Sequence, residues 1–272
     1  MKLLLVTALL LQFSNAIDID FAALGNLARS KMTTSNMKKA SHYAQDMYDE
    51  YSGENTVVTR RKVKGRRLKF PINHRLLFSD RNCDMPFQNS QLYSCYDYGY
   101  KIPVLTGYIV SAEDLKKGYI EDRPSFYPEN SIPRKYRSYP SDFKNSGFDR
   151  GHSRSHASTA WSKEDIYETY TMANIFPQTP ELNRKSWLKV EKYERLIARK
   201  LGSIYVLNIA EVPENPRVIG KHKVAVPSGY YKVIVNQEAD FKKCFYFMNK
   251  QNMDLSNDRL KAHEIDCNKV YY

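Results

Sequence analysis

An amphipathic helix with a clear start constrains this chain more than any other feature. Thr179 can cap a helix N-terminus, Pro180 suits the first helical position, and Glu181 suits the positive end of the helix dipole. At about 100° per residue, one stripe of side chains continues along the helix and would pack on a sheet. We therefore expect a helix over residues 180–201 that lies on a sheet. The stripe contains Ser186, Val190, Tyr193, Ile197 and Leu201.

Three polar side chains follow one side of this helix, beside the stripe. Asn183, Glu191 and Arg195 are separated by eight and four residues, and these spacings bring them to one side of a helix. An amide, a carboxylate and a guanidinium would together form a ledge for a metal ion and a phosphate. The alternative is ordinary surface chemistry, with Asn183 facing solvent and Glu191 paired with Arg195 at i+4, an arrangement that contributes only ~0.3 kcal/mol.

A histidine upstream supplies the base that this ledge lacks. His152 ends the run Phe-Asp-Arg-Gly-His at 148–152, directly after a turn at 145–147. An unperturbed imidazole has a pKa of roughly 6.5, so near neutral pH it can take a proton from water. The amide oxygen of Asn183 suits magnesium, a hard ion that keeps most of its waters. The alternative for a lone histidine in such a context is a structural role.

Four short motifs in series resemble one family. Asp-Arg-Gly-His at 149–152 is followed by Asn-Ile-Phe-Pro-Gln at 174–178, Asn-x-x-x-Trp at 183–187 and Glu-x-x-x-Arg at 191–195. This ordered series resembles the DNA/RNA non-specific endonuclease family, whose members are ββα-metal nucleases. The resemblance implies hydrolysis of phosphodiester bonds in DNA or RNA as the substrate, with magnesium as cofactor and manganese as a substitute.

The resemblance also implies a role for each matched residue. His152 would be the general base, Asn183 the direct protein ligand of magnesium, and Glu191 would order the waters around the ion. Phosphate contacts carry no base identity, so we expect weak sequence preference. At the remaining catalytic positions the resemblance implies phosphate binding by Arg150 and Arg195 and a hydrogen-bonding partner at Asn174.

The chain departs from the family pattern at three places. Ile109 stands where the family commonly has an arginine in a Tyr-Arg-x-Thr context, so either Lys101 substitutes or the substrate is held more weakly. Residues 153–156, Ser-Arg-Ser-His, are more polar than the usual Leu-Ala-Pro, and their arginine and histidine could add contacts. Asn208 replaces a glycine that is usual in the following strand. We expect these departures to alter rate and substrate preference more than reaction type.

The N-terminus is typical of a removable export signal. Lys2 precedes an apolar run at 3–11, and small residues end at Ala16; the run is too short to span a bilayer. The alternatives are a core helix or a retained anchor. We expect cleavage near Ala16, export to the periplasm or the medium, and no stable membrane anchor. A helical extension over 17–57 and an endonuclease domain over 58–272 would follow the signal peptide at 1–16.

The charge of the chain agrees with a nucleic-acid partner. The formal net charge is +12, and nucleic acid or an anionic membrane is the usual partner of such an excess. Residues 58–70 hold seven basic residues and no acidic one. This run either contacts phosphates or is a solvated linker.

The four cysteines predict disulfides. Their wide spacing lacks the Cys-x-x-Cys pairs of a zinc knuckle, and an even number in an exported chain suggests two disulfides. Three pairings are possible. We favour Cys83–Cys95 and Cys244–Cys267 because short loops close at a lower entropy cost.

The fold prediction is α+β, a central antiparallel sheet flanked by helices and bearing a ββα-metal finger. Strands are expected at 104–110, 203–212, 223–226, 230–235 and 244–248.

Two rival functions remain. One is a non-catalytic nucleic-acid-binding protein on a nuclease scaffold, and the other is a nuclease toxin or effector whose basic N-terminal region contacts a partner. The sequence makes no prediction of the oligomeric state.

Overall fold

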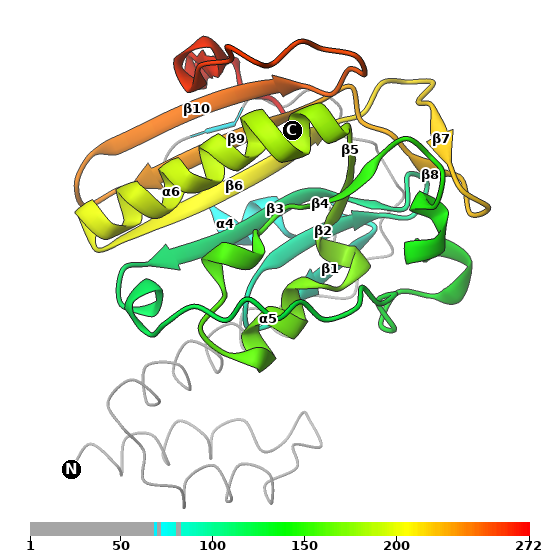
Figure 1. Cartoon of the computed structure of the whole chain (residues 1–272), viewed down its shortest axis with the longest axis horizontal. Helices are drawn as coiled ribbons and strands as arrows, with labels where there is room; N and C mark the ends of the chain where they lie inside the picture. The colour runs from blue at the N-terminus through cyan, green and yellow to red at the C-terminus, as the bar shows by residue number, and fades with distance from the viewer. Residues whose placement is uncertain (1–67, 70–71, 80–82) are drawn as a thin grey trace, which may run out of the picture. The chain divides into compact units, whose positions relative to one another are not determined.

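A seven-stranded antiparallel sheet is the framework of the chain (Figure 1). The computed structural model describes residues 68–69, 72–79 and 83–272. The strands lie in the order β1-β2-β3-β6-β9-β10-β11, and each is antiparallel to its neighbours. Their bounds are β1 Met85–Gln88, β2 Tyr93–Asp97, β3 Ile102–Ser111, β6 Ser203–Glu211, β9 Gly229–Asn236, β10 Phe241–Met248 and β11 Glu264–Ile265.

Two small sheets and three α-helices accompany this sheet in the described residues. β4 (Asp149–His152) pairs with β5 (Ile175–Gln178), and β7 (Val218–Ile219) pairs with β8 (Val224–Ala225). The architecture confirms the α+β prediction, and each of the five predicted strand segments is present. The α-helices are α4 His74–Leu77, α5 Lys163–Thr169 and α6 Leu188–Leu201; the 3₁₀ turns are Asp114–Lys116, Arg134–Tyr136, Pro140–Phe143, His156–Ser158, Met172–Asn174, Leu260–His263 and Cys267–Lys269.

The predicted helix begins at Pro180, but it is not uniform. A π-helical segment, Leu182–Trp187, precedes α6. Its wider turn contains an additional residue, so eight positions complete about two turns, where an α-helix needs about seven. The π segment therefore brings Asn183 and Glu191 to the same side of the helix. The sequence pattern gave no sign of this segment.

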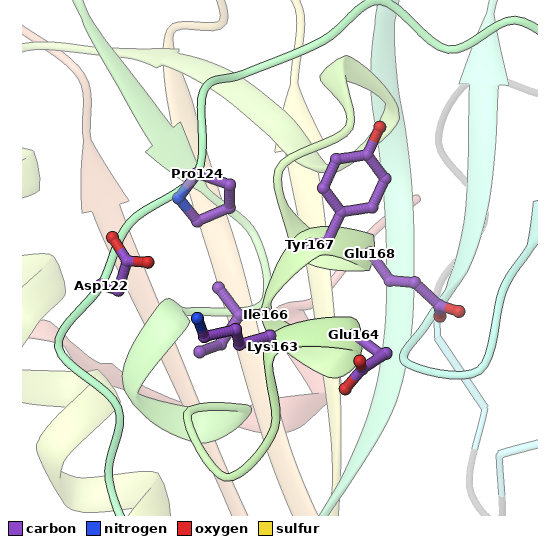
Figure 2. A pocket seen from close by; sticks show the side chains of 7 residues that line it. All are labelled: Asp122, Pro124, Lys163, Glu164, Ile166, Tyr167 and Glu168. Atoms are coloured by element: carbon purple, nitrogen blue, oxygen red, sulfur yellow. The ribbon is translucent and has the colours of Figure 1, made fainter.

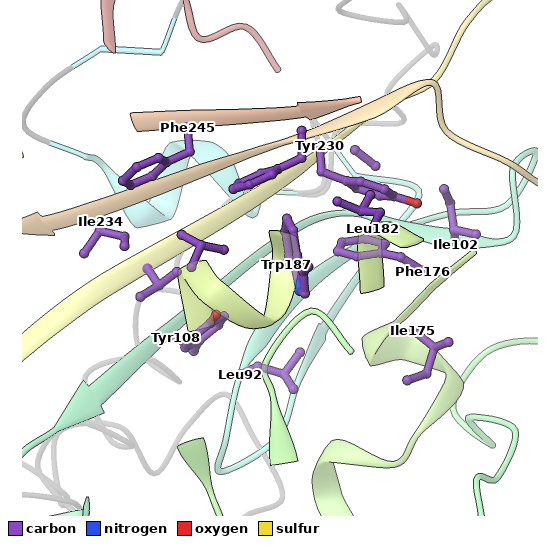
Figure 3. Close-up of a cluster of buried hydrophobic side chains, with 14 of the residues drawn as sticks. Leu92, Ile102, Tyr108, Ile175, Phe176, Leu182, Trp187, Tyr230, Ile234 and Phe245 are labelled. Carbon is purple, nitrogen blue, oxygen red and sulfur yellow. The ribbon is translucent and has the colours of Figure 1, made fainter. Parts of the chain in front are cut away.

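The face of the sheet under α6 holds the larger core (Figure 3). Side chains alternate across a strand, so Tyr108 of β3 and Ile234 of β9 point toward the helix and are buried. Trp187, at the end of the π segment, is fully buried, and its ring centroid lies 5.7 Å from that of Tyr230. Trp187 is therefore a core residue.

The opposite face of the sheet carries a second core and both disulfides. α4 and the C-terminal residues around Val270 pack there on β3, β6, β9 and β10. Cys83 is bonded to Cys95, and Cys244 to Cys267. The sequence-local pairing is confirmed.

The N-terminal predictions lie outside the described residues. These are the signal peptide at 1–16, the helical extension at 17–57 and most of the basic run at 58–70. Among the helices of the described part, none is both long and apolar enough to cross a membrane.

Candidate active site

A cleft of about 1010 Å³ opens beside the start of the long helix. It is lined by β4, by the π segment and α6, and by the loop around residues 119–126. The cleft brings together five residues that the sequence predicts for the site: Arg150, His152, Asn183, Glu191 and Arg195.

The strand that carries His152 is fixed on two sides. On one side, β4 pairs with β5, which places His152 opposite Ile175. On the other, the indole Nε1 of Trp187 donates a hydrogen bond of 3.2 Å to the His152 carbonyl oxygen. The residue before His152 must be a glycine, because a Cβ at Gly151 would collide with the buried side-chain amide of Gln178.

The imidazole of His152 lies against aromatic rings and keeps an unpaired nitrogen. Its centroid is 5.2 Å from that of Phe126 and 4.7 Å from that of Tyr170. The residue as a whole is half-buried, yet Nε2 itself is covered and has no hydrogen-bond partner in the described residues. Burial, followed by the positive charges of His156, Arg123 and Arg150, lowers the pKa of His152 to about 3. The ring is therefore neutral at physiological pH and able to accept a proton.

The amide of Asn183 is oriented by Asp149. Asn183 Nδ2 donates to Asp149 Oδ2 at 3.0 Å, and Arg184 donates to both carboxylate oxygens at 2.8 Å. A carboxylate only accepts hydrogen bonds, so the NH₂ group of Asn183 must face it. No described residue donates to the remaining oxygen, Oδ1, of this cleft residue. The motif aspartate thus leaves that oxygen available to a metal ion.

Glu191 is a buried carboxylate without an ion pair in the described part of the chain. Burial, followed by the negative charge of Glu194, raises the pKa of Glu191 to about 8. Arg195 does not pair with it at i+4; the guanidinium instead donates to the hydroxyls of Ser155 (3.2 Å) and Ser158 (3.3 Å). The alternative of an ordinary helix ion pair is therefore wrong.

The potential metal ligands in the cleft fit a magnesium ion better than a zinc ion. No group of three His, Cys, Asp or Glu side chains in the described residues could hold a metal. The cleft instead offers oxygen atoms, from the oriented amide of Asn183 and the unpaired carboxylate of Glu191. Magnesium takes oxygen ligands and retains several waters, so it needs few protein ligands.

Asn174 lies behind the cleft, fully buried. Its side chain accepts from the backbone N–H of Arg154 (2.9 Å) and donates to the carbonyls of Arg154 (3.0 Å) and Thr169 (2.8 Å). These contacts hold the chain that follows His152, which is the hydrogen-bonding role expected of Asn174.

Arg154 and His156, the two residues of the 153–156 segment that could add contacts, already have partners within the fold. Arg154 is buried, and its guanidinium donates to the Gln91 carbonyl and lies 5.4 Å from the centroid of the Tyr108 ring. His156 lines the cleft, but its nitrogens contact the Ile120 carbonyl (2.9 Å) and the Tyr170 hydroxyl (3.3 Å). Both side chains are occupied by the fold.

Arg123 is a basic cleft residue that sequence reasoning missed. Ile109 is 60% exposed, whereas Tyr108 next to it is buried under α6, so the Ile109 side chain points to the opposite face of the sheet. Lys101 does not line the cleft; its Nζ donates to the His222 carbonyl at 2.6 Å. Arg123 lines the cleft, and its charge lowers the pKa of His152. The loop composition held no signal that could locate it.

A second hollow, of about 450 Å³, has the wrong charge for a nucleic acid (Figure 2). Three of its side chains are carboxylates and one is a lysine, and it contains none of the predicted site residues. The larger cleft is therefore the candidate active site. The hollow is lined by Asp122, Pro124, Lys163, Glu164, Ile166, Tyr167 and Glu168.

The fold and the cleft define a class of protein. Two paired strands, β4 and β5, lead into a helix, with a histidine on the strand and an asparagine on the helix; this is the ββα-metal nuclease fold. The family model described as DNA/RNA non-specific endonuclease matches residues 80–270. The chain belongs to that family.

Known proteins with similar sequences and structures agree with this assignment. "Endonuclease G, mitochondrial" of Bos taurus is 33% identical over 124 residues, 42% of this chain and 42% of that protein. "Nuclease C1" of Cunninghamella echinulata var. echinulata is 26% identical over 210 residues, 70% of this chain and 83% of that protein. The chain thus spans less than half the length of the bovine relative.

A solved structure shares the fold. A chain of the crystal structure of the EndoG/EndoGI complex matches with a TM-score of 0.58 and 23% identity, over 66% of this chain and 80% of that one. This likeness concerns the fold alone.

Proposed function

We propose that the chain is a metal-dependent endonuclease that hydrolyses phosphodiester bonds of DNA and RNA with weak sequence preference. The observation that carries the proposal is the partnerless Nε2 of His152 in the same cleft as the oriented amide of Asn183. A buried polar atom without a partner is costly. Such an arrangement is expected where the missing partner is a substrate water or a metal ion.

His152 acts as the general base in this proposal. Its lowered pKa keeps the imidazole neutral, so Nε2 can take a proton from the attacking water. Asn174 and Trp187 act as positioning residues, because they hold the backbone on either side of the ring. Arg150, Arg195 and Arg123 bind phosphate oxygens through charge-assisted hydrogen bonds.

Asn183 and Glu191 hold the cofactor, Mg²⁺, for which Mn²⁺ can substitute. Asn183 Oδ1 is the direct ligand, and the Glu191 carboxylate orders bound waters in the manner of an outer-sphere partner. When bound, the ion neutralises charge that develops on the phosphate and leaving oxygen.

Export to the periplasm or the medium is part of the proposal. The signal-like residues 1–16 and the two disulfides support it, because disulfides persist in oxidising compartments. The mitochondrial location in the relatives' names belongs to those proteins.

Nicking of a supercoiled plasmid tests the function. We expect cleavage by the wild type with Mg²⁺, and none with EDTA or with His152→Ala or Asn183→Ala. His222→Gln is the matched control, because His222 pairs with Asp142 and does not line the cleft. A folded wild type that binds DNA but leaves the plasmid supercoiled with Mg²⁺ would establish the non-catalytic rival. Parallel digestion of duplex DNA, single-stranded DNA and RNA defines the substrate.

A further inference from the structure

A polar row crosses the middle of the sheet under α6. Thr106 of β3 lies opposite Asn208 of β6, and Asn208 lies opposite Lys232 of β9. All three are fully buried. A lysine in such a place is costly unless its charge is paired.

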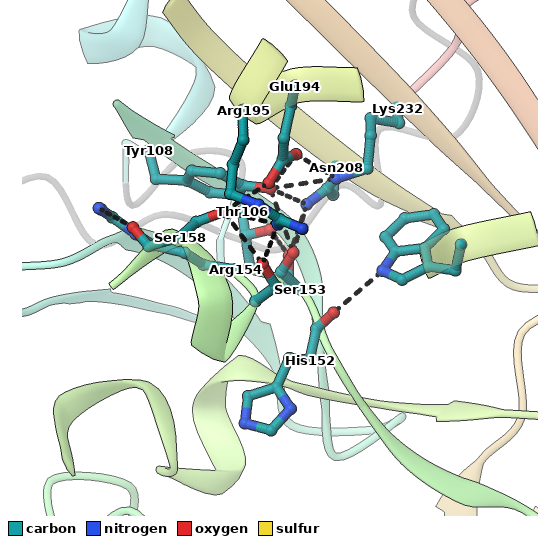
Figure 4. A network of polar contacts seen from close by, with 12 residues as sticks. Thr106, Tyr108, His152, Ser153, Arg154, Ser158, Glu194, Arg195, Asn208 and Lys232 are labelled. Atoms are coloured by element: carbon teal, nitrogen blue, oxygen red, sulfur yellow. Dashed lines mark hydrogen bonds and ion pairs between the residues drawn. The ribbon is translucent and has the colours of Figure 1, made fainter. Parts of the chain in front are cut away.

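The partner of Lys232 is Glu194 of α6, which is equally buried (Figure 4). Lys232 Nζ lies 3.0 Å from Glu194 Oε2 and 3.0 Å from the Tyr108 hydroxyl. Tyr108 in turn donates to Glu194 Oε2 at 3.0 Å. The negative charge of the Glu194 carboxylate is therefore compensated by Lys232 within the core. A buried ion pair adds little net stability compared with an apolar pair, so stability does not explain why it is here.

The ion pair is connected to the cleft through Ser158. Its hydroxyl donates to Glu194 Oε1 at 2.9 Å and accepts from Arg195 Nη1 at 3.3 Å. Arg195 also donates to the Ser155 hydroxyl at 3.2 Å. Arg195 has no ion pair among the described residues, although Glu194 precedes it in sequence. The hydrogen bonds of the Arg195 guanidinium go to neutral hydroxyls, which do not compensate its positive charge.

The same network reaches the residue after His152. Asn208 Nδ2 donates to the Ser153 carbonyl at 3.0 Å and to the Ser153 hydroxyl at 2.9 Å. Two departures from the family pattern, Ser153 and Asn208, thus belong to one network with Lys232 and Glu194.

We propose that Lys232 is a positioning residue for Arg195: by neutralising Glu194, it leaves the Arg195 guanidinium free to bind phosphate. The Ser158 hydroxyl lies between Glu194 and Arg195. Without the lysine charge, the Glu194 carboxylate would attract the Arg195 guanidinium into the core, toward the place that this hydroxyl occupies. The guanidinium would then be neutralised before substrate binds. This inference rests on the proposed function, in which Arg195 contacts phosphate.

The salt dependence of binding tests the proposal. Binding of a fluorescein-labelled single-stranded oligonucleotide is measured by anisotropy at pH 8, in EDTA, over a series of KCl concentrations. We expect Lys232→Met to reduce the slope of log K against log[KCl] by about 0.7, the value for one lost phosphate contact on a single strand. Arg195→Gln should give the same reduction. Lys232→Met/Glu194→Gln should restore the wild-type slope, because neither charge remains.

Two further results complete the test. If Lys232→Met does not fold, Tyr108→Phe takes its place: it removes one donor from Glu194 and should reduce the slope by a smaller amount. An unchanged slope in the folded variant, or no recovery in the double variant, would overturn the proposal. Because the assay excludes metal, it is independent of cleavage; failure of the proposed function would appear as intact plasmid in the nicking assay with normal slopes here.

Discussion

The Trp187 indole Nε1 donates a hydrogen bond to the carbonyl oxygen of His152. This bond joins the π segment of the helix to the strand that carries the candidate base. It therefore couples the position of the proposed metal-binding residues on the helix, Asn183 and Glu191, to that of the imidazole on β4.

Replacing Trp187 with phenylalanine should loosen this connection. The variant leaves the His152 carbonyl unpaired and a cavity in the core, and we expect a loss of about 2 to 3 kcal/mol in the free energy of unfolding. Chemical denaturation measures the loss. Trp161→Phe is the control, because Trp161 is half-buried and its indole nitrogen has no acceptor in the described residues; equal losses in the two variants would contradict the role of the bond.

Asp149→Asn should weaken metal binding without removing the ligand. An asparagine can donate as well as accept, so it no longer fixes which end of the Asn183 amide faces the cleft. We expect the Mg²⁺ concentration for half-maximal cleavage to rise by about 10- to 100-fold.

The control for this variant is Arg184→Gln. It removes the exposed ion pair to Asp149 but keeps the bond to Asn183, so a change of less than about threefold is expected. The idea fails if Arg184→Gln raises the Mg²⁺ requirement as much as Asp149→Asn does.

The raised pKa of Glu191 predicts proton release on metal binding. Below its pKa of about 8 the metal-free carboxyl holds a proton, and a cation must displace it. Mg²⁺ affinity should therefore rise with pH, by up to about tenfold per unit between roughly pH 6 and 8, and level off above. Calorimetry in two buffers of different ionisation enthalpy counts the protons. Glu191→Gln should abolish the release; identical release by both proteins would refute the assignment.

The Cys244–Cys267 disulfide should contribute to stability through its loop. It ties the C-terminal residues to β10 and closes a separation of 23 residues. The chain-entropy relation gives about 3 kcal/mol for a loop of this size. Cys244→Ser/Cys267→Ser should lower the unfolding midpoint accordingly. In this variant, dithiothreitol should lower the midpoint only through reduction of the remaining Cys83–Cys95 bond. Equal stability of the variant and the oxidised wild type would show that the loop constraint is negligible.

The sequence predicted the parts of the site that depend on local pattern. Thr179, Pro180 and the apolar stripe located the helix because capping and periodicity are local properties, and the disulfides followed from short loops. Arg123 was missed because its position in the cleft depends on how an irregular loop folds back on β4. The π segment and the Lys232–Glu194 pair were missed for a related reason, since tertiary packing determines them.

A last prediction concerns which residue binds phosphate, because the arginine in the cleft is Arg123 and the family's arginine position is Ile109. Arg123 lines the cleft, whereas Ile109 lies on the opposite face of the sheet, so of these two positions Arg123 alone can reach a substrate beside His152. Arg123→Ala should reduce the salt slope for single-stranded DNA by about 0.7 and raise KM, whereas Ile109→Arg should leave both unchanged. Restoring an arginine at the family's apparent position would then have no benefit, because facing the cleft matters more than sequence position. A gain in affinity from Ile109→Arg, with none lost in Arg123→Ala, would show that phosphate is bound across the other face of the sheet.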